Sequence, residues 1–221
     1  MPLLDSLIKK WQIKCIIFDL DGTLVNTLDK HILAFQKLFQ ELKLNYSQKE
    51  ISKNMGRTPK DILLTLIPEL KYHEEKLNYF ALKKEEILTN LLDEIPLMKG
   101  SIELLNNINT KKLFLALASS TPKFNVDKII NVTKIGQYFN LIITGEDITI
   151  GKPNPEIFLK VTEKLNIKPK ECVVIGDSTH DVLAARNCSM RIIAVTTGKH
   201  NKREISLLKP DYILKSLKEL I

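Results

Sequence analysis

The stretch IIFDLDGTL, residues 16–24, joins a short apolar run to two aspartates and a glycine. A run that is almost entirely apolar is typical of a strand buried on both faces of a parallel sheet. Asp19 and Asp21 follow at once, so we expect their carboxylates at the rim of that sheet. Because two like charges so close together repel each other, the pair indicates a ligand at this rim.

The same pattern recurs along the chain and predicts the architecture. Apolar runs that are typical of buried strands cover residues 14–19, 113–119, 140–144, 172–177 and 191–197. Segments with helical patterns separate them, at residues 101–109, 123–131, 155–165 and 181–187. Strands that alternate with helices predict a doubly wound parallel sheet, which is an α/β fold. We expect residues 210–214 to add an edge strand and residues 215–221 a last helix.

Residues 27–93 interrupt this alternation, because they show helical periodicity almost throughout and no strand pattern. Apolar side chains recur at the spacing of one helix face, at Leu28, Ile32, Phe35, Phe39 and Leu42. Such a stripe is typical of core packing. We therefore expect residues 27–93 to form an all-helical inserted domain, and residues 1–26 and 94–221 to form the α/β core.

Composition and charge narrow the class of protein. The 221 residues are 44% hydrophobic and 27% charged, as in an ordinary soluble protein. We find neither the ~20 apolar residues that span a bilayer nor a signal peptide, so we expect a cytoplasmic protein without membrane contact. The net charge of +7 comes from lysines spread among glutamates, which favours a solvated surface over nucleic-acid binding. Three cysteines without a CxxC spacing indicate core thiols. The protein is expected to be a monomer or a homodimer.

Polar residues follow several of the predicted strands at the point where each strand ends. The clusters contain Asp19 with Asp21, Ser119 with Ser120, GKPNP at residues 151–155 and GDSTHD at residues 176–181. In an open parallel sheet, ligands bind outside the carboxyl ends of the strands, near the point where the strand order reverses. We therefore expect these clusters to converge on one site.

The residue types in these clusters fit phosphoryl transfer to a carboxylate. Asp19 can act as a nucleophile and form an aspartyl-phosphate, which divides one difficult displacement into two easier ones. An anion that attacks a phosphate dianion needs positive charge nearby, and Mg²⁺ held by carboxylates provides it. Asp177 would join Asp19 as a ligand. Asp181 would bind the metal either directly or through a water molecule.

The remaining residues of the clusters complete this chemistry. Asp21 is free to protonate the leaving oxygen and later to accept a proton from the attacking water. Lys152 places a point charge against the nucleophile and the phosphoryl group. Ser119 offers a hydroxyl to the phosphoryl oxygens, and Ser120 is a second possible phosphate contact.

These clusters resemble, in the same order, the four motifs of the haloacid dehalogenase superfamily of phosphatases. The matching segments are FDLDGTL, LALASS, Lys152 in GKPNPEIF, and VVIGDSTHD, within residues 16 to about 198. The resemblance implies a Rossmann-like core, a helical cap at residues 27–93 and the main-chain carbonyl of Asp21 as a further Mg²⁺ ligand. The insert is similar to that of phosphoglycolate phosphatases, β-phosphoglucomutases and phosphonoacetaldehyde hydrolases. Asp21 argues against dehalogenation, because true dehalogenases lack this aspartate.

The expected function is Mg²⁺-dependent hydrolysis of small phosphorylated metabolites, as in phosphoglycolate phosphatases. A β-phosphoglucomutase-like mutase is the alternative, followed by a phosphonoacetaldehyde hydrolase or a non-catalytic binding protein. Within MGRTPKD, Arg57 and Lys60 either bind the substrate or are solvated charges at a helix start. His180 either touches the substrate or the metal or is a solvent-exposed loop residue, and we expect the latter. The other histidines are expected on the surface without partners, at His31, His73 and His200.

Overall fold

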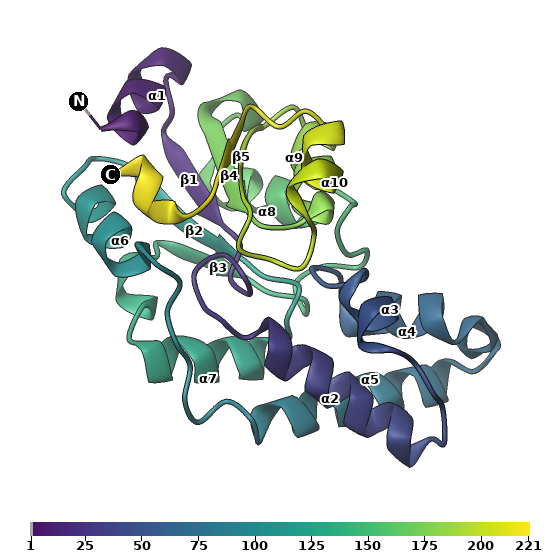
Figure 1. Ribbon diagram of the computed structural model, residues 1–221. Coiled ribbons are helices and arrows are strands. Elements are labelled where there is room, and N and C mark those ends of the chain that lie inside the picture. Colours follow the sequence, from purple (N-terminus) through teal and green to yellow (C-terminus); the bar gives the residue numbers. More distant parts are fainter. Residues whose placement is uncertain (1) are drawn as a thin grey trace.

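The computed structural model describes residues 2–221 and contains a six-stranded sheet in the order β3-β2-β1-β4-β5-β6 (Figure 1). Each neighbouring pair of strands is parallel. The strands are β1 (Cys15–Phe18), β2 (Phe114–Ala118), β3 (Leu141–Ile143), β4 (Cys172–Gly176), β5 (Arg191–Val195) and β6 (Tyr212–Leu214). The predicted doubly wound α/β fold is confirmed, including the edge strand.

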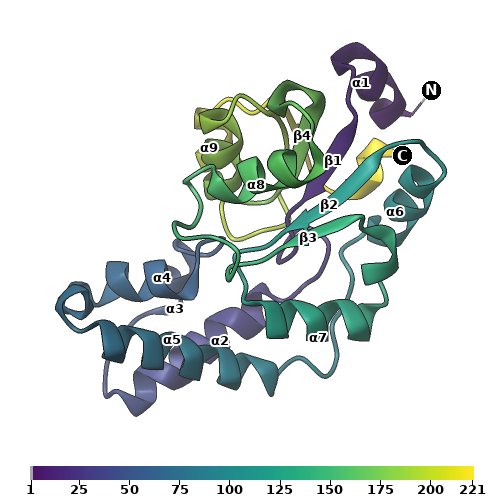
Figure 2. The same cartoon turned by 180° about the vertical axis from the view of Figure 1, so that it is seen from behind.

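Helices cover both faces of the sheet, because alternate residues of each strand point to opposite sides. Ile16 and Phe18 belong to one apolar cluster, whereas Cys15 and Ile17 belong to another. Helices on the first face are α1 (Leu3–Trp11), α6 (Ser101–Asn109) and α7 (Lys123–Thr133). Helices on the second face are α8 (Glu156–Leu165), α9 (Thr179–Asn187) and α10 (Lys202–Leu207), and Figure 2 shows the sheet from behind.

Helix α1 at the start of the chain and three short 3₁₀ helices complete the core. No element is predicted before the first strand, but α1 forms there and buries Leu4 and Leu7. The expected last helix is a short 3₁₀ helix that buries Leu217 and Leu220. The 3₁₀ helices of the core are η2 (Gly136–Tyr138), η3 (Pro169–Glu171) and η4 (Leu217–Leu220). All three cysteines are free and buried, as expected for core thiols.

A block of helices follows β1 and has its own apolar core. It contains α2 (Leu28–Glu41), α3 (Gln48–Ser52), α4 (Pro59–Leu66), η1 (Pro68–Tyr72) and α5 (Glu74–Thr89). The stripe along α2 is buried against the other helices of the block, with Phe35 completely covered. We propose residues 27–93 as the limits of this inserted domain. Within residues 2–221, the structure has no helix that is both long and apolar enough for a membrane span.

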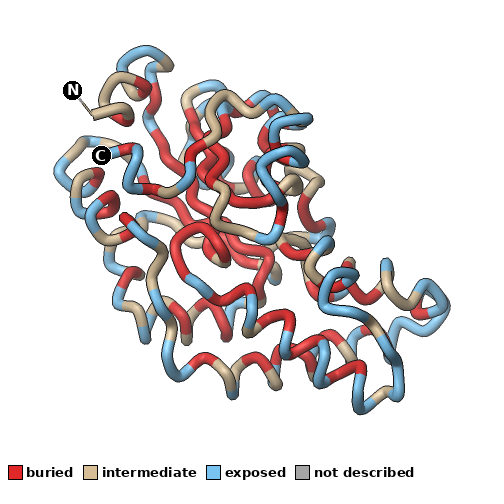
Figure 3. Tube along the Cα trace, viewed as in Figure 1, coloured by how far each residue is buried: buried red, intermediate tan, exposed pale blue. Residues whose placement is uncertain are grey.

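The strand order indicates a ligand-binding edge of the sheet that faces the helical block. Along the chain, β1, β2 and β3 extend the sheet in one direction, and β4 to β6 extend it from the other side of β1. The order therefore reverses between β1 and β4, where ligands of such sheets bind. Their carboxyl ends point toward the helical block (Figure 1), and Figure 3 shows buried chain running from these strands into it.

Candidate active site

Lys152 and Asp19 form a buried ion pair at the carboxyl end of β1. Nζ of Lys152 lies 2.6 Å from Oδ1 of Asp19 and 2.8 Å from Oδ1 of Asp181. The same ammonium donates a hydrogen bond to the carbonyl of Ala118, at 3.0 Å. The Lys152 side chain is completely buried, so its charge acts on the carboxylates with little screening by solvent.

Three aspartates converge at this point. Carboxylate oxygens of Asp19, Asp177 and Asp181 lie within 4.8 Å of one another, and all three residues are buried. Burial raises the pKa of Asp19 to about 7, although the ammonium of Lys152 acts in the opposite direction. Burial and repulsion from Asp19 also raise the pKa of Asp177 well above its usual range. Ionisation of all three carboxylates would therefore give more negative charge than Lys152 alone compensates.

This donor set fits a hard divalent cation. Mg²⁺ is usually held by one or two carboxylates together with water and substrate oxygens. The aspartate cluster supplies such oxygens from buried residues after β1, after β4 and in the first turn of α9, and a bound cation would offset the repulsion between its carboxylates. The hydroxyl oxygen of Thr23 lies 3.0 Å from Oδ1 of Asp177 and 3.3 Å from Oδ2 of Asp19, so its single proton is shared between these two carboxylates.

Gly22 is required by the closeness of Asp177. Its φ of +89° lies in the region that favours glycine, and a Cβ there would lie 2.5 Å from Oδ2 of Asp177. The glycine after the second aspartate of the opening stretch thus lets the chain turn beside the aspartate that follows β4.

Asp181 has partners for both of its carboxylate oxygens. Oδ2 accepts hydrogen bonds from the hydroxyl of Ser178 at 2.6 Å and from its main-chain N–H at 3.1 Å, as part of the cap that begins α9. Oδ1 faces Lys152. Burial alone would raise the pKa of Asp181, but Lys152 and Ser178 lower that pKa below its usual value. Asp181 is therefore held as a carboxylate beside the ammonium.

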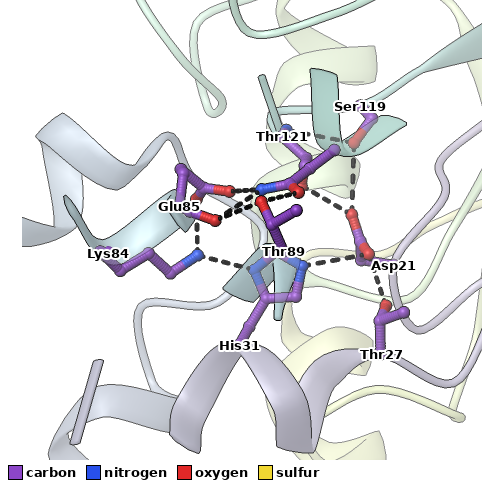
Figure 4. Close-up of polar contacts among 9 residues, drawn as sticks. Asp21, Thr27, His31, Lys84, Glu85, Thr89, Ser119 and Thr121 are labelled. Atoms are coloured by element: carbon purple, nitrogen blue, oxygen red, sulfur yellow. Dashed lines mark hydrogen bonds and ion pairs between the residues drawn. The ribbon is translucent and has the colours of Figure 1, made fainter. Parts of the chain in front are cut away.

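Asp21 lies in a separate polar environment (Figure 4). Its Oδ2 accepts hydrogen bonds from Thr121 at 2.8 Å and from Ser119 at 3.3 Å, and its Oδ1 accepts one from Thr27. Nε2 of His31 lies 3.2 Å from Oδ1. Burial alone would raise the pKa of Asp21, but His31 and the two threonine hydroxyls hold that pKa well below its usual range.

His31 joins Asp21 to the interior of the helical block. Nδ1 of His31 lies 3.0 Å from Nζ of Lys84, which is 2.6 Å from Oε1 of Glu85. Glu85 in turn accepts a hydrogen bond from Asn125 of α7 at 2.6 Å. These four side chains are buried, so they form a continuous polar path between the two parts of the molecule.

The expectation of a surface position for His31 is wrong. Its position on α2, three residues after Leu28 and four before Phe35, places it on the buried face of that helix. This spacing from Leu28 and Phe35 was the feature of the sequence that indicated a buried position for His31. His73 is exposed, as expected. Lys84 and Glu85 were not predicted, because no local pattern distinguishes them from the other charged residues of α5.

The expectation for His200 is also wrong, because this residue is buried. Its Nε2 lies 3.3 Å from the carbonyl of Lys53. His180 is half-buried and not an exposed loop residue, and its ring lies edge-on to that of His200 with centroids 5.4 Å apart. Burial and the neighbouring His200 lower the pKa of His180 to about 4.

The two serines after β2 face different partners. Ser119 accepts a hydrogen bond from the main-chain N–H of Thr121 at 3.1 Å and points its own hydroxyl at Asp21. Ser120 donates to the carbonyl of Gly56 at 3.0 Å and so contacts the loop before α4. Thr121 was not among the predicted residues, yet it makes the shorter hydrogen bond to Asp21.

A small cavity lies over the aspartates, with a volume of about 30 Å³. Its lining includes Asp19, Asp21, Ser120 and, from the helical block, Arg57. Arg57 donates to Thr65 at 2.8 Å, and its buried Nε has no hydrogen-bond partner. Lys60 is exposed and lies outside this cavity, along a neighbouring groove. The structure thus brings Arg57, but not Lys60, to the cavity.

Comparisons with known proteins agree with this geometry. The family model described as "Haloacid dehalogenase-like hydrolase" matches residues 16–195. Pyrophosphatase PpaX of Oceanobacillus iheyensis is 29% identical over 209 residues, which are 95% of each chain. A phosphorylated carbohydrates phosphatase of Thermotoga maritima is 30% identical over 218 residues, 94% of this chain and all of the relative.

Solved structures share the same fold. A hydrolase from Pseudomonas syringae superposes with a TM-score of 0.87 at 24% identity, over 94% of this chain and 95% of the other. A β-phosphoglucomutase from Clostridium difficile superposes with a TM-score of 0.83 at 26% identity, over 95% of this chain and 93% of the other.

Proposed function

Because this chain belongs to the haloacid dehalogenase-like hydrolases and is a phosphatase, we propose that it hydrolyses phosphate monoesters of small metabolites through an aspartyl-phosphate on Asp19. The observation that carries the proposal is the buried ion pair between Asp19 and Lys152 within a cluster of three carboxylates. A location in the cytoplasm and a monomeric or homodimeric state remain expectations.

The acidic cluster is the proposed Mg²⁺ site. Asp19, Asp177 and the main-chain carbonyl of Asp21 would hold the ion, and Asp181 would reach it through a water molecule because its own oxygens face Lys152 and Ser178. When bound, the cation would neutralise charge on the transferring phosphoryl group.

In the first half-reaction, a carboxylate oxygen of Asp19 attacks phosphorus and the bond to the leaving oxygen breaks. Lys152 fixes the orientation of this carboxylate through its 2.6 Å contact. Asp21 gives its proton to the leaving oxygen. In the second half-reaction, water attacks phosphorus, Asp21 takes the proton from that water, and the bond between phosphorus and Asp19 breaks.

The surroundings of Asp21 suit the second half-reaction. His31 and the hydroxyls of Thr27 and Thr121 favour its carboxylate form, which is the form that accepts a proton from water. We propose Ser119, Ser120 and Lys152 as contacts of the phosphoryl group. Arg57 is a further proposed substrate contact at the small cavity, and Lys60 is a proposed contact along the neighbouring groove.

A phosphosugar mutase is the second candidate, supported by the likeness to the β-phosphoglucomutase structure. It would use the same aspartyl-phosphate but return the phosphoryl group to the sugar. A phosphonoacetaldehyde hydrolase would need a lysine near the reacting carbon, and the exposed position of Lys60 does not favour it. A non-catalytic binding protein would not need the buried pair of Asp19 and Lys152.

The test is phosphate release by the wild type and Asp19→Asn, with Mg²⁺ and with EDTA. Substrates are phosphoglycolate, sugar phosphates, nucleotides, pyrophosphate and phosphonoacetaldehyde. We expect Mg²⁺-dependent release that is lost in Asp19→Asn and retained in Asp127→Asn, a control at an exposed aspartate of α7. Near-wild-type release by Asp19→Asn would contradict the mechanism. Conversion of β-glucose 1-phosphate to its 6-phosphate isomer without phosphate release would favour the mutase.

A further inference from the structure

A second and larger hollow adjoins the small cavity over the aspartates. It has a volume of about 630 Å³ and lies between helices α4 and α5 of the helical block and the loops that follow β2 and β3. Pockets that hold small ligands are commonly about 300–1,000 Å³. We call this hollow the outer groove.

The outer groove and the cavity share part of their walls. Pro59, Glu85 and Ser120 line both. The cavity itself, at about 30 Å³, has room for roughly two water molecules. A phosphate ester that reaches Asp19 therefore has no space in the cavity for a large leaving group. The outer groove is the adjoining space in which such a group would fit.

Apolar side chains make up much of the outer groove. They are Pro59, Leu64, Leu77, Ala81, Leu82, Pro122, Phe124 and Ile148. Phe124 is 40% exposed and Leu82 is 52% exposed, on opposite sides of the boundary between core and helical block. Exposed apolar side chains that meet at a groove are typical of a binding surface.

The charges along the outer groove are unsuited to a second anionic group. Among the described residues that line it, Lys60 is the single basic residue, against the acidic Asp61, Glu85 and Glu146. Glu85 is paired with Lys84, and Lys60 is exposed to solvent. A leaving group that carries a phosphate or carboxylate would meet net negative charge here.

We propose that the outer groove binds the leaving group of the substrate and that this group is uncharged and largely apolar. The inference rests on the proposed phosphatase function and names its substrate class, namely monophosphates of apolar alcohols. It also favours hydrolysis over a phosphosugar mutase. A sugar bisphosphate intermediate must reorient within the site, so a mutase needs a second binding position for a phosphate group.

The test uses a series of n-alkyl phosphates from ethyl to hexyl phosphate, whose leaving alcohols differ little in acidity. Burial of one methylene group is worth about a fourfold change in binding. We expect kcat/KM to rise about tenfold or more along the series. A hexyl phosphate with a terminal carboxylate should lose most of this gain, because the added charge faces Asp61 and Glu146.

Two matched variants locate the effect. Phe124→Ala should flatten the dependence of kcat/KM on chain length. Phe114→Ala, at a phenylalanine of similar exposure at the start of β2 and outside the groove, should keep the wild-type dependence. Thermal unfolding of both variants checks that each is folded.

The outcomes separate the groove from the chemistry. A flat chain-length profile in the wild type, with ethyl phosphate hydrolysed, would overturn the groove assignment and leave the phosphatase intact. A rise that persists in Phe124→Ala, or one that the terminal carboxylate does not reduce, would also overturn it. Absence of Asp19-dependent phosphate release from every compound would instead refute the proposed function, and the groove assignment with it.

Discussion

Nε2 of His31 lies 3.2 Å from Oδ1 of Asp21, so a side chain of the helical block directly contacts the proposed acid and base of the core. On its other side, His31 contacts the buried Lys84 of α5. The charge environment of Asp21 therefore depends on how α2 and α5 lie over the end of β1. Movement of the helical block away from the sheet would remove His31 from Asp21.

Replacement of His31 tests this dependence. His31→Gln removes the imidazole that lowers the pKa of Asp21, so this pKa should rise and the acidic limb of the kcat profile should move to higher pH. We expect kcat at neutral pH to fall about tenfold to a hundredfold, which is less than the 10²–10⁴-fold effect of a complete acid–base group. The measurement is a pH–rate profile under saturating substrate.

His73→Gln is the matched control, because His73 is exposed at the start of α5. It should leave the profile unchanged. An acidic limb that stays at the same pH in His31→Gln would show that this histidine does not set the protonation of Asp21.

The pair of Lys84 and Glu85 should affect stability strongly. Their side chains are 1% and 2% exposed, with the charged atoms 2.6 Å apart. Loss of one partner leaves a buried charge uncompensated, which typically costs about 3–5 kcal/mol. We expect a large loss of stability in Lys84→Met and in Glu85→Gln, and a smaller loss in the double variant than the sum. Urea unfolding of the four proteins measures this coupling, and additive losses would contradict it.

The fold and the acidic cluster could be predicted from local patterns. Each strand is a short apolar run, and Asp19 and Asp177 come directly after such runs. Parallel strands bring their carboxyl ends to one edge of the sheet, so residues 158 positions apart could be expected to meet. Helix α1 was not predicted, because its stripe of apolar residues lies before the alternation of strands and helices on which the prediction was based.

The contacts of the helical block could not be predicted in the same way. Lys84 is one of several charged residues on α5, and its burial follows from the packing of that helix against α2 and α7 rather than from a local pattern. Arg57 could be named as a candidate, but its unpartnered Nε depends on where the loop before α4 meets the core. Such contacts are set by tertiary packing.

Replacement of Asp177 should raise the stability of the metal-free protein and lower its activity. Asp177→Asn removes one of three crowded carboxylates, and its burial raises the pKa of this group. The metal-free variant should therefore unfold at a higher temperature than the metal-free wild type. Phosphatase activity should fall at least a hundredfold, and the rise in melting temperature on addition of Mg²⁺ should shrink. An unchanged response to Mg²⁺ would exclude Asp177 as a ligand.

Lys152 should be needed for both folding and activity. Lys152→Met keeps the apolar stem but removes the charge between Asp19 and Asp181. We expect activity to fall at least a hundredfold and stability by about 3–5 kcal/mol. Lys128→Met, at a lysine of α7 that is 29% exposed and paired with Asp93, is the control and should cost at most about 1 kcal/mol. Urea unfolding and phosphate release distinguish the two.

The metal-free protein should lose stability as the pH rises through neutrality. The pKa of Asp19 is raised to about 7 in the folded state, from an ordinary value of 3.8, and that of Asp177 is raised as well. A raised carboxyl pKa means that the folded chain binds protons that the unfolded chain has already released. Stability from these groups is therefore present at low pH and is lost as the pH rises through the folded-state pKa.

Between pH 6 and pH 8 this loss should amount to about 1–3 kcal/mol, since one bound proton changes the free energy of unfolding by about 1.4 kcal/mol per pH unit. Asp21 and Asp181 have lowered pKa values, so their contribution changes only below their ordinary value and leaves this interval unaffected. Saturating Mg²⁺ should flatten the dependence, because a bound cation favours the carboxylates over their protonated forms. Urea unfolding in EDTA and in Mg²⁺ at both pH values measures the difference. Equal slopes under the two conditions would show that the cation does not bind at these aspartates.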